Sequence, residues 1–178
     1  FGHRDYTLLG RVRVQLDDAG LTIPNPGGFV EGINIHNLLT AEPHGRNPCL
    51  MDALKRTGLA ERTGRGIDRI FEGALNYGRP LPDYSRSNRR GVSVLLPRSV
   101  PDKAFVELLT EERERSGKSM SLDGLLILDK LKSERRCGFD VLSGSLDMSD
   151  QRLRTVLGQL TEAGLVESAG VGARRTYM

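Results

Sequence analysis

Tryptophan is absent from the chain of 178 residues, histidine occurs three times, cysteine occurs twice, and only 5% of the residues are aromatic. The two cysteines, Cys49 and Cys137, lie far apart and lack the paired spacing of a zinc site or a disulfide framework. His36 and His44 have no third ligand at the spacing that a metal requires. We therefore expect no metal site, and thiols that stay reduced in a cytoplasm.

Long hydrophobic runs are also missing, since the longest one is the "LLIL" of Leu125–Leu128. A membrane-spanning helix needs about 20 apolar residues, so no membrane association is expected. No signal peptide is visible. The chain starts at Phe1 without an initiator methionine, and we expect it to be an internal or C-terminal piece of a longer protein.

Charge of one sign is not dominant, because the net charge is +3 and the isoelectric point is near 9.1. Such a balance permits nucleic-acid binding without requiring it. The basic residues gather in "RSNRR" at 86–90 and "RR" at 174–175, whereas "TEERER" at 110–115 mixes both signs. The two basic clusters are therefore the first candidates for contact with an anionic partner.

Residues 1–97 alternate short extended and helical patterns. The "RVRVQL" of Arg11–Leu16 alternates polar and apolar residues, which predicts a strand with Val12, Val14 and Leu16 facing a core. This mixture indicates an α+β sandwich with helices on one face of a sheet. The remaining expected elements are a strand in "LTIPN", a short helix near 35–39, helices at about 48–57 and 66–76, and a strand at 91–97.

Residues 98–118 read as a linker segment, in which prolines bracket the join and a helix follows in "DKAFVELLTEERER". "SGKS" at Ser116–Ser119 resembles the end of a phosphate-binding P-loop. That motif needs glycine at position 112, where this chain has Glu112, and it needs a preceding buried strand. We therefore interpret 116–121 as a hinge.

Residues 119–178 carry the clearest pattern in the chain. Leu153, Val156, Leu157 and Leu160 recur at helical spacing, with Ser149 or Asp150 as the N-cap and Gly164 after the helix end. Two further helices precede this one, and two short strands around a glycine-rich tip follow it. Three helices and a β-hairpin predict a winged helix-turn-helix domain.

The polar face of that helix is a candidate DNA-reading surface. Arginine and glutamine side chains hydrogen-bond base edges in the major groove, and arginine also binds phosphates. Basic residues on the wing would contact the flanking backbone. The alternative is a winged helix that serves protein contacts or dimerisation, with its arginines merely solvated. The candidate DNA-binding residues are Gln151, Arg152, Arg154, Thr155, Arg174 and Arg175.

Four motifs in the first part stand in a fixed order: "HRDY" at 3–6, "NPGGF" at 25–29, "RNP" at 46–48 and "ERTGRGIDRI" at 61–70. Together they resemble the GHKL-like ATPase module at the C-terminal end of bacterial Schlafen-AlbA-type transcriptional regulators, a module often labelled RecG-like ATP-dependent DNA helicase. The resemblance covers about residues 1–97, and a winged helix also follows the module in that family. It implies an N-terminally truncated GHKL-like α/β sandwich.

The resemblance also implies a nucleotide site. "NPGG" takes the place of the glycine box that borders the adenine pocket, and "GRGI" takes the place of the box whose amides meet the phosphates. Glycine permits close backbone approach, and the helix N-terminus favours anions. The implied cofactor is ATP with Mg²⁺ in the longer parent protein. The implied cofactor-binding residues are Asn25, Gly27, Gly28, Gly64, Arg65 and Gly66.

Two departures from the family pattern argue against ATP hydrolysis by this chain. The helix that supplies the catalytic glutamate and the metal-binding asparagine lies before "HRDY" in the family, and this chain starts after it. The adenine-reading aspartate is replaced by Asn25, which is not an acceptor-only anion. We expect no catalytic residue here.

A kinase is excluded too, because "HRD" lacks the asparagine that follows it in kinases and no "DFG" occurs. Arg4 and Asp5 are expected to form structural hydrogen bonds.

The sequence therefore predicts a DNA-binding transcriptional regulator of which this chain is a C-terminal part. Double-stranded DNA is the expected partner, and a nucleotide or a second copy of the chain are further candidates. One alternative is an ATP-binding switch, in which the nucleotide closes the glycine boxes and reorients the winged helix. The other is an interaction or dimerisation module.

Overall fold

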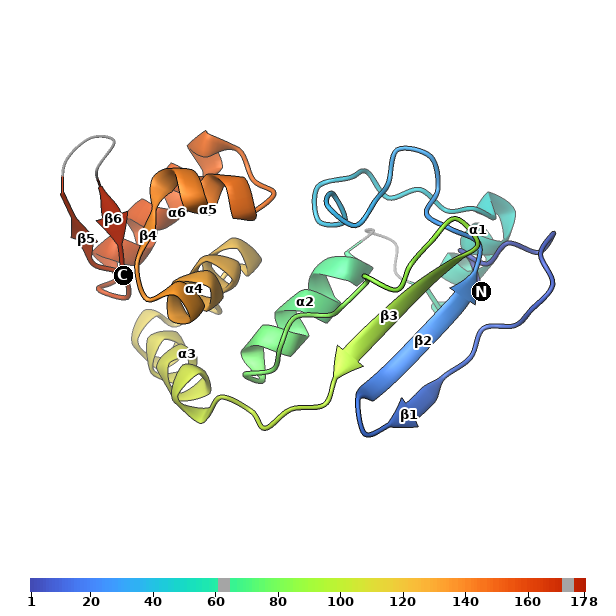
Figure 1. Ribbon diagram of the computed structural model, residues 1–178, viewed down its shortest axis with the longest axis horizontal. Helices are drawn as coiled ribbons and strands as arrows, with labels where there is room; N and C mark the ends of the chain where they lie inside the picture. Colours follow the sequence, from blue (N-terminus) through green and yellow to red (C-terminus); the bar gives the residue numbers. More distant parts are fainter. Residues whose placement is uncertain (61–64, 171–174) are drawn as a thin grey trace. The chain divides into compact units, whose positions relative to one another are not determined.

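The computed structural model describes residues 1–60, 65–170 and 175–178. By their internal contacts the residues form two units, Phe1–Asp102 and Lys103–Met178 (Figure 1). Helix α3 (Lys103–Ser116), which the sequence interpretation assigned to a linker, therefore belongs to the second unit. Arg115 of α3 contacts the rest of this unit, since its guanidinium donates to the backbone oxygen of Ala163 at 2.8 Å.

The first unit is built on a three-stranded antiparallel sheet in the order β1-β2-β3. Its strands are β1 (Gln15–Asp17), β2 (Gly20–Pro26) and β3 (Gly91–Pro97). The turn between β1 and β2 is closed by the Asp17 carboxylate, which accepts hydrogen bonds from the backbone N–H groups of Ala19 at 2.9 Å and Gly20 at 3.3 Å. Aspartate favours such turns because its short side chain reaches the following amides.

The predicted strand at Arg11–Leu16 is only partly formed, and its expected burial is wrong. The regular strand starts at Gln15, and the side chains of Val14 and Leu16 are 71% and 79% exposed. The alternating pattern correctly indicates an extended segment, but β1 is the outermost strand of the sheet. Since no described segment packs over these two side chains, they face solvent.

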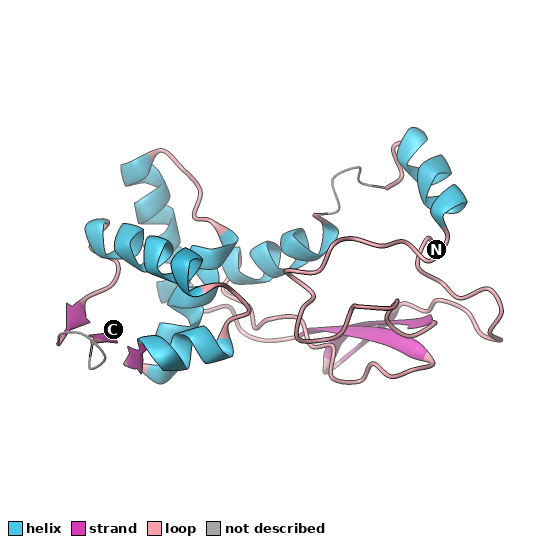
Figure 2. Cartoon of the chain, turned by 90° about the horizontal axis from the view of Figure 1, so that it is seen from above, coloured by secondary structure: helices cyan, strands magenta, loops and turns pink. Residues whose placement is uncertain are grey.

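Two helices accompany the sheet, α1 (Pro48–Arg56) and α2 (Gly66–Asn76), and Figure 2 shows both on the same side of it. Pro48 stands at the first helical position of α1, where its missing N–H costs nothing. On α2, Leu75 is 1% exposed, and the ring of Phe71 stacks on that of Tyr84 with centroids 6.5 Å apart. Burial raises the pKa of Tyr84.

The short helix expected near 35–39 does not form, and turns occupy this stretch. The side-chain oxygen of Asn37 accepts from the N–H of Asn34 at 2.7 Å, and that of Asn34 accepts from the N–H of His36 at 2.8 Å. Asparagine side chains that bond neighbouring amides offer the backbone an alternative to the helical pattern. These two asparagines therefore break the helix that the flanking apolar residues suggest.

In its described residues, the second unit contains four helices and a small sheet of three strands in the order β4-β6-β5. Strand β4 was not predicted, because two residues carry no periodic signal; it exists through the pairing of Cys137 with Tyr177. The other expected elements are present. In chain order after α3 they are α4 (Leu122–Glu134), β4 (Cys137–Gly138), α5 (Phe139–Ser145), α6 (Asp150–Glu162), β5 (Ser168–Ala169) and β6 (Thr176–Tyr177).

Helix α6 begins and ends as its sequence predicts. The Ser149 hydroxyl accepts from the N–H of Arg152 at 3.3 Å, so serine is the N-cap, and Gly164 follows the helix with a φ of +73°. The apolar stripe of Leu153, Val156, Leu157 and Leu160 is buried along its whole length. Among the described helices, none combines the length and the apolar character that a membrane crossing requires.

We expect Leu153→Ala to lower the free energy of unfolding of the second unit by about 2–5 kcal/mol. The side chain is 0% exposed, so its truncation leaves a cavity between α6 and its neighbours. Urea denaturation followed by circular dichroism measures the change. The control is Gln159→Ala on the exposed face of the same helix, which should change stability by less than about 0.5 kcal/mol. Equal effects of the two substitutions would contradict the burial.

Candidate functional site

The first glycine motif follows β2 directly and is packed against the chain's own backbone. The N–H of Gly27 donates to the carbonyl of Arg90 at 2.8 Å, and Gly27 has a φ of +103°. A Cβ on Gly27 would lie 2.7 Å from the Cβ of Asp5, and one on Gly28 would lie 2.8 Å from the carbonyl oxygen of Arg89. The close approach of neighbouring segments therefore accounts for both glycines.

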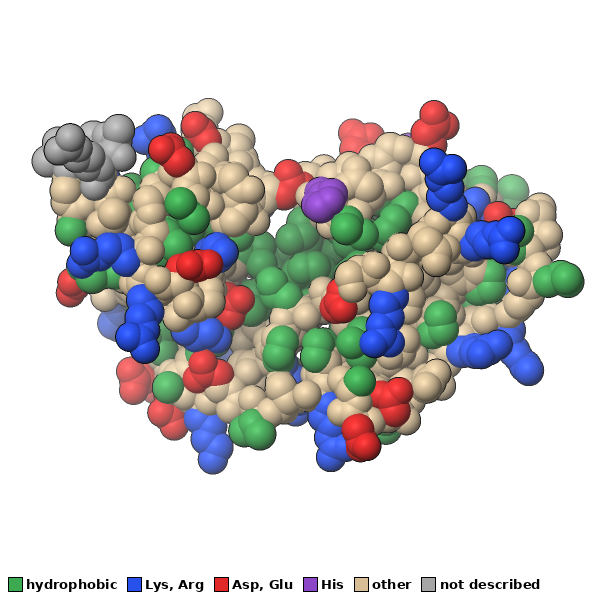
Figure 3. All heavy atoms as spheres, in the orientation of Figure 1, with side chains coloured by type: hydrophobic (Ala, Val, Ile, Leu, Met, Phe, Trp, Pro, Cys, Tyr) green, Lys and Arg blue, Asp and Glu red, His purple; other side chains and the backbone are tan. Residues whose placement is uncertain are grey.

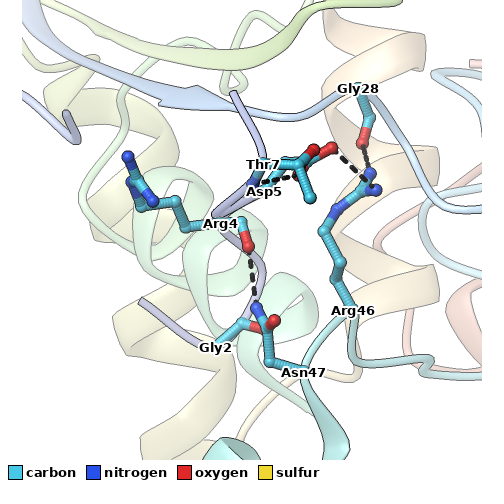
Figure 4. A network of polar contacts seen from close by, with 7 residues as sticks. All are labelled: Gly2, Arg4, Asp5, Thr7, Gly28, Arg46 and Asn47. Carbon is cyan, nitrogen blue, oxygen red and sulfur yellow. Dashed lines mark hydrogen bonds and ion pairs between the residues drawn. The ribbon is translucent and has the colours of Figure 1, made fainter. Parts of the chain in front are cut away.

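Arg46 joins three of the four sequence motifs (Figure 4). Its guanidinium donates to the carbonyl of Gly28 at 2.6 Å and lies 3.5 Å from a carboxylate oxygen of Asp5. Beside it, the amide of Asn47 donates to the carbonyl oxygens of Gly2 at 3.0 Å and Arg4 at 2.7 Å. We call this set, Arg46 and Asn47 with the segments 2–5 and 27–28 that they hold, the Arg46 clasp.

The structural role predicted for Arg4 and Asp5 is confirmed. The guanidinium of Arg4 donates to the carbonyl of Gly10 at 2.5 Å and lies over the ring of Tyr6. One carboxylate oxygen of Asp5 accepts from the hydroxyl of Thr7 at 2.6 Å and from its N–H at 2.9 Å. These bonds, and the charge of nearby Arg46, hold the pKa of Asp5 below its usual value.

Asn25, also predicted to bind the cofactor, lies in β2 opposite Val92 of β3. Its side-chain oxygen is buried and has no hydrogen-bond partner among the described residues. Buried polar atoms normally find a partner, so an unpaired acceptor calls for an explanation. Within the first glycine motif this oxygen is the group that would accept a hydrogen bond from a ligand.

The second glycine motif opens α2, and Gly64 lies outside the described residues. Among the described residues, no side chain or distant backbone atom stands within 4 Å of the place where a Cβ on Gly66 would lie. Arg65 is not a free cation, since its guanidinium lies 3.7 Å from the carboxylate of Asp68 and 3.5 Å from that of Glu72. Both carboxylates offset the positive charge of Arg65, which a phosphate would need for binding.

The fit to ATP and Mg²⁺ is thus partial. The side-chain oxygen of Asn25 is an unused acceptor, and no described side chain crowds Gly66. Gly27 and Gly28, in contrast, are closed by the chain itself. In the described ranges no group of His, Cys, Asp or Glu side chains is arranged to hold a metal ion.

The predicted DNA-binding residues of α6 are exposed, but two of them are anchored within the second unit. The guanidinium of Arg152 forms a two-bond ion pair with the carboxylate of Asp123 on α4, in which Nη2 and Oδ1 are 2.8 Å apart. The guanidinium of Arg154 lies 4.1 Å from the ring centroid of Phe139 on α5. Asp123 and Phe139 were missed from sequence, because no local pattern links residues so far apart along the chain.

The remaining predicted residues are less constrained. Gln151 is exposed, and the Thr155 hydroxyl donates to the Gln151 carbonyl at 3.0 Å, which keeps it along the helix. Arg175 is exposed just before β6, and Arg174 lies outside the described residues. Figure 3 shows acidic and basic side chains interspersed on the second unit, so the visible surface has no field of one sign.

Comparison with known families identifies the first unit in part. Residues 10–96 match the family described as "Putative ATP-dependent DNA helicase recG C-terminal". Residues 10–96 of the first unit are therefore similar to an ATPase-like domain of the RecG C-terminal type. A search of curated proteins finds no match for the chain.

A solved structure supports the fold of both units. The DIP2311 protein from Corynebacterium diphtheriae is 22% identical, with a TM-score of 0.78 over 99% of this chain and 37% of that chain. At this identity the similarity shows the fold alone. The chain spans 37% of the length of that structure.

We expect Arg46→Ala to destabilise the first unit by about 1.5–3 kcal/mol, because the substitution leaves the Gly28 carbonyl without its charged donor. Urea denaturation measures the loss. The control is Arg11→Ala, which removes an equal charge from an exposed residue of the same unit and should change stability by less than about 0.5 kcal/mol. Equal free energies of unfolding for the two variants would contradict a stabilising role of the Arg46 clasp.

Proposed function

We propose that the second unit is a winged helix that binds double-stranded DNA, and that the chain is the C-terminal part of a bacterial transcriptional regulator of the Schlafen-AlbA type. The order of elements carries this proposal. Helices α4, α5 and α6 are followed by the β5–β6 hairpin, and β4 between α4 and α5 pairs with β6. This is the order of a winged helix, in which the last helix reads the major groove and the hairpin is the wing.

The exposed side chains of α6 suit such a role. Gln151, Arg152 and Arg154 offer amide and guanidinium groups of the kind that bind base edges and phosphates. The contacts to Asp123 and Phe139 do not exhaust these groups, since a guanidinium has five N–H donors and the ion pair of Arg152 uses two. An anchored arginine loses less freedom on binding, so these contacts pre-organise the surface.

The charges limit how strongly the surface would attract DNA without regard to sequence. Asp123 offsets the charge of Arg152, whereas no carboxylate of the described residues pairs with Arg154 or Arg175. Each phosphate that a protein neutralises contributes about −0.9 to the slope of log affinity against log salt. We therefore expect a moderate slope that depends on Arg154 and Arg175.

We expect Arg154→Ala/Arg175→Ala to weaken binding to a fluorescein-labelled random duplex by about tenfold or more and to reduce the salt slope by about two. Both charges would otherwise meet phosphates. Fluorescence anisotropy between about 50 mM and about 200 mM salt measures both quantities. The matched control, Arg113→Ala, removes one exposed charge from α3 of the same unit and should leave the affinity within about twofold.

Two outcomes would contradict DNA binding through α6 and the wing. One is the absence of binding by the wild-type chain at low salt, after which a protein partner becomes the better occupant of the α6 face. The other is a loss of affinity in Arg113→Ala that, per charge removed, equals that of the double variant, because binding would then follow total charge and not this surface.

An ATP-binding switch is the second candidate function, favoured by the unpaired acceptor of Asn25 and by the family match over residues 10–96. ATP would supply an exocyclic amino group as donor to this oxygen. The close packing of Gly27 against Asp5 and Arg46, and of Gly28 against the backbone of Asn88 and Arg89, weighs against it, since a ligand would have to enter beside packed backbone.

The switch predicts that ATP binds the chain through Asn25. Isothermal titration calorimetry with ATP and Mg²⁺ should then give a heat signal in the wild type that Asn25→Leu removes, because leucine has a similar size and no acceptor. Asn76→Leu at the exposed end of α2 is the control and should bind as the wild type does. Equal binding by both variants would count against a role of Asn25, and no heat in the wild type would count against the switch.

A further inference from the structure

The free edge of the first sheet belongs to β1 (Figure 1). The opposite edge is covered, because Asp83 bridges to Leu95 and Asn88 to Gly91 beside β3. Strand β1 pairs with β2 on one side only, and the described residues provide no strand for its other side. An unpaired edge presents a row of free N–H and C=O groups, which makes it a template for another strand.

The hydrogen-bond pattern shows which backbone groups are free. The N–H of Arg13 donates to the carbonyl of Pro24 in β2 at 3.2 Å. Bonded and non-bonded residues alternate along an antiparallel pair, so Gln15 and Asp17 also turn their backbone groups toward β2. The N–H and C=O groups of Val14 and Leu16 consequently point away from the sheet.

The side chains of this edge are self-complementary. Arg13 and Asp17 carry opposite charges and lie two residues on either side of Gln15. Val14 and Leu16 flank Gln15 directly, and both are largely exposed, at 71% and 79%. Exposed aliphatic side chains that alternate with opposite charges are an unusual surface for a strand that has no partner.

We propose that β1 pairs in antiparallel fashion with β1 of a second copy of this chain, about a twofold axis at Gln15. In this register Val14 of each copy exchanges backbone hydrogen bonds with Leu16 of the other. Arg13 then lies opposite Asp17 at a non-bonded pair, where the side chains are closest. The twofold axis makes the Arg13–Asp17 ion pair and the Val14–Leu16 bonded pair each occur twice, as an isologous interface requires.

The pairing also continues an apolar row that already exists within one copy. The register of the sheet sets Leu16 beside Leu21 of β2 and Leu21 beside Leu96 of β3. In the pair of copies, Val14 of the partner would extend this row across the axis. The result is one sheet of two joined halves, in which exposed Val14 and Leu16 gain an apolar neighbour on the same face.

Sedimentation velocity over a range of concentrations tests the pairing through its charges. We expect the wild-type chain to dimerise, and Arg13→Asp and Asp17→Arg each to weaken the dimer by about tenfold or more, since both ion pairs become like-charge pairs. An equimolar mixture of the two variants should dimerise again, because each copy then opposes the reversed charge of the other. This result requires positions 13 and 17 of the two copies to lie close together, as they do in the proposed register.

A second variant avoids the turn that Asp17 closes. Leu16→Lys places a charge at position 16, where the proposed dimer forms its backbone hydrogen bonds, and should abolish the dimer. Circular dichroism checks that the monomer stays folded. Leu9→Lys is the control, since Leu9 is fully exposed and lies outside β1. A wild-type chain that stays monomeric, a mixture that fails to associate, or a Leu9→Lys variant as impaired as Leu16→Lys would overturn the proposal. DNA affinity plays no part in this readout.

Discussion

The hydrogen bond from Arg46 to the carbonyl of Gly28 is the contact on which the first unit most depends. Among the described residues of this unit, Leu75 and Tyr84 are the large hydrophobic side chains that are buried, at 1% and 8% exposure. Such a small core cannot by itself hold the first residues of the chain to the sheet. The Arg46 clasp does so with hydrogen bonds from the charged guanidinium of Arg46, which are stronger than neutral ones, and with neutral bonds from the amide of Asn47. All of them become costly to break once they are partly buried.

The clasp changes the meaning of the glycine motif. A glycine-rich turn beside a strand suggests a phosphate or a nucleotide, yet at Gly27 and Gly28 the nearest atoms belong to Asp5 and Arg89. The motifs that resemble a nucleotide-binding family thus also form the hydrogen bonds that hold three segments of this unit together. The same residues would serve a ligand only where an unused group remains, as at Asn25.

The sequence predicts what depends on local periodicity and fails where a partner distant in the chain decides. The stripe of Leu153 and Val156 and the Ser149 cap are visible because a helix repeats every 3.6 residues and serine bonds the next turn. The exposure of Leu16 is not visible, since alternation cannot tell an edge strand from a covered one. The anchoring of Arg152 by Asp123 likewise appears only when α4 and α6 are placed side by side, and the helix near 35–39 was lost to asparagine side chains.

We propose a first unit that is held by its own polar contacts and a second unit that presents a helix for binding DNA. Nuclear magnetic resonance mapping of backbone amide shifts during titration with a short duplex tests this division most directly. The account predicts shifts concentrated at Gln151, Arg154 and Arg175, with the amides of Gly27 and Gly28 unchanged. Shifts confined to the first unit, or none at saturating duplex, would contradict it.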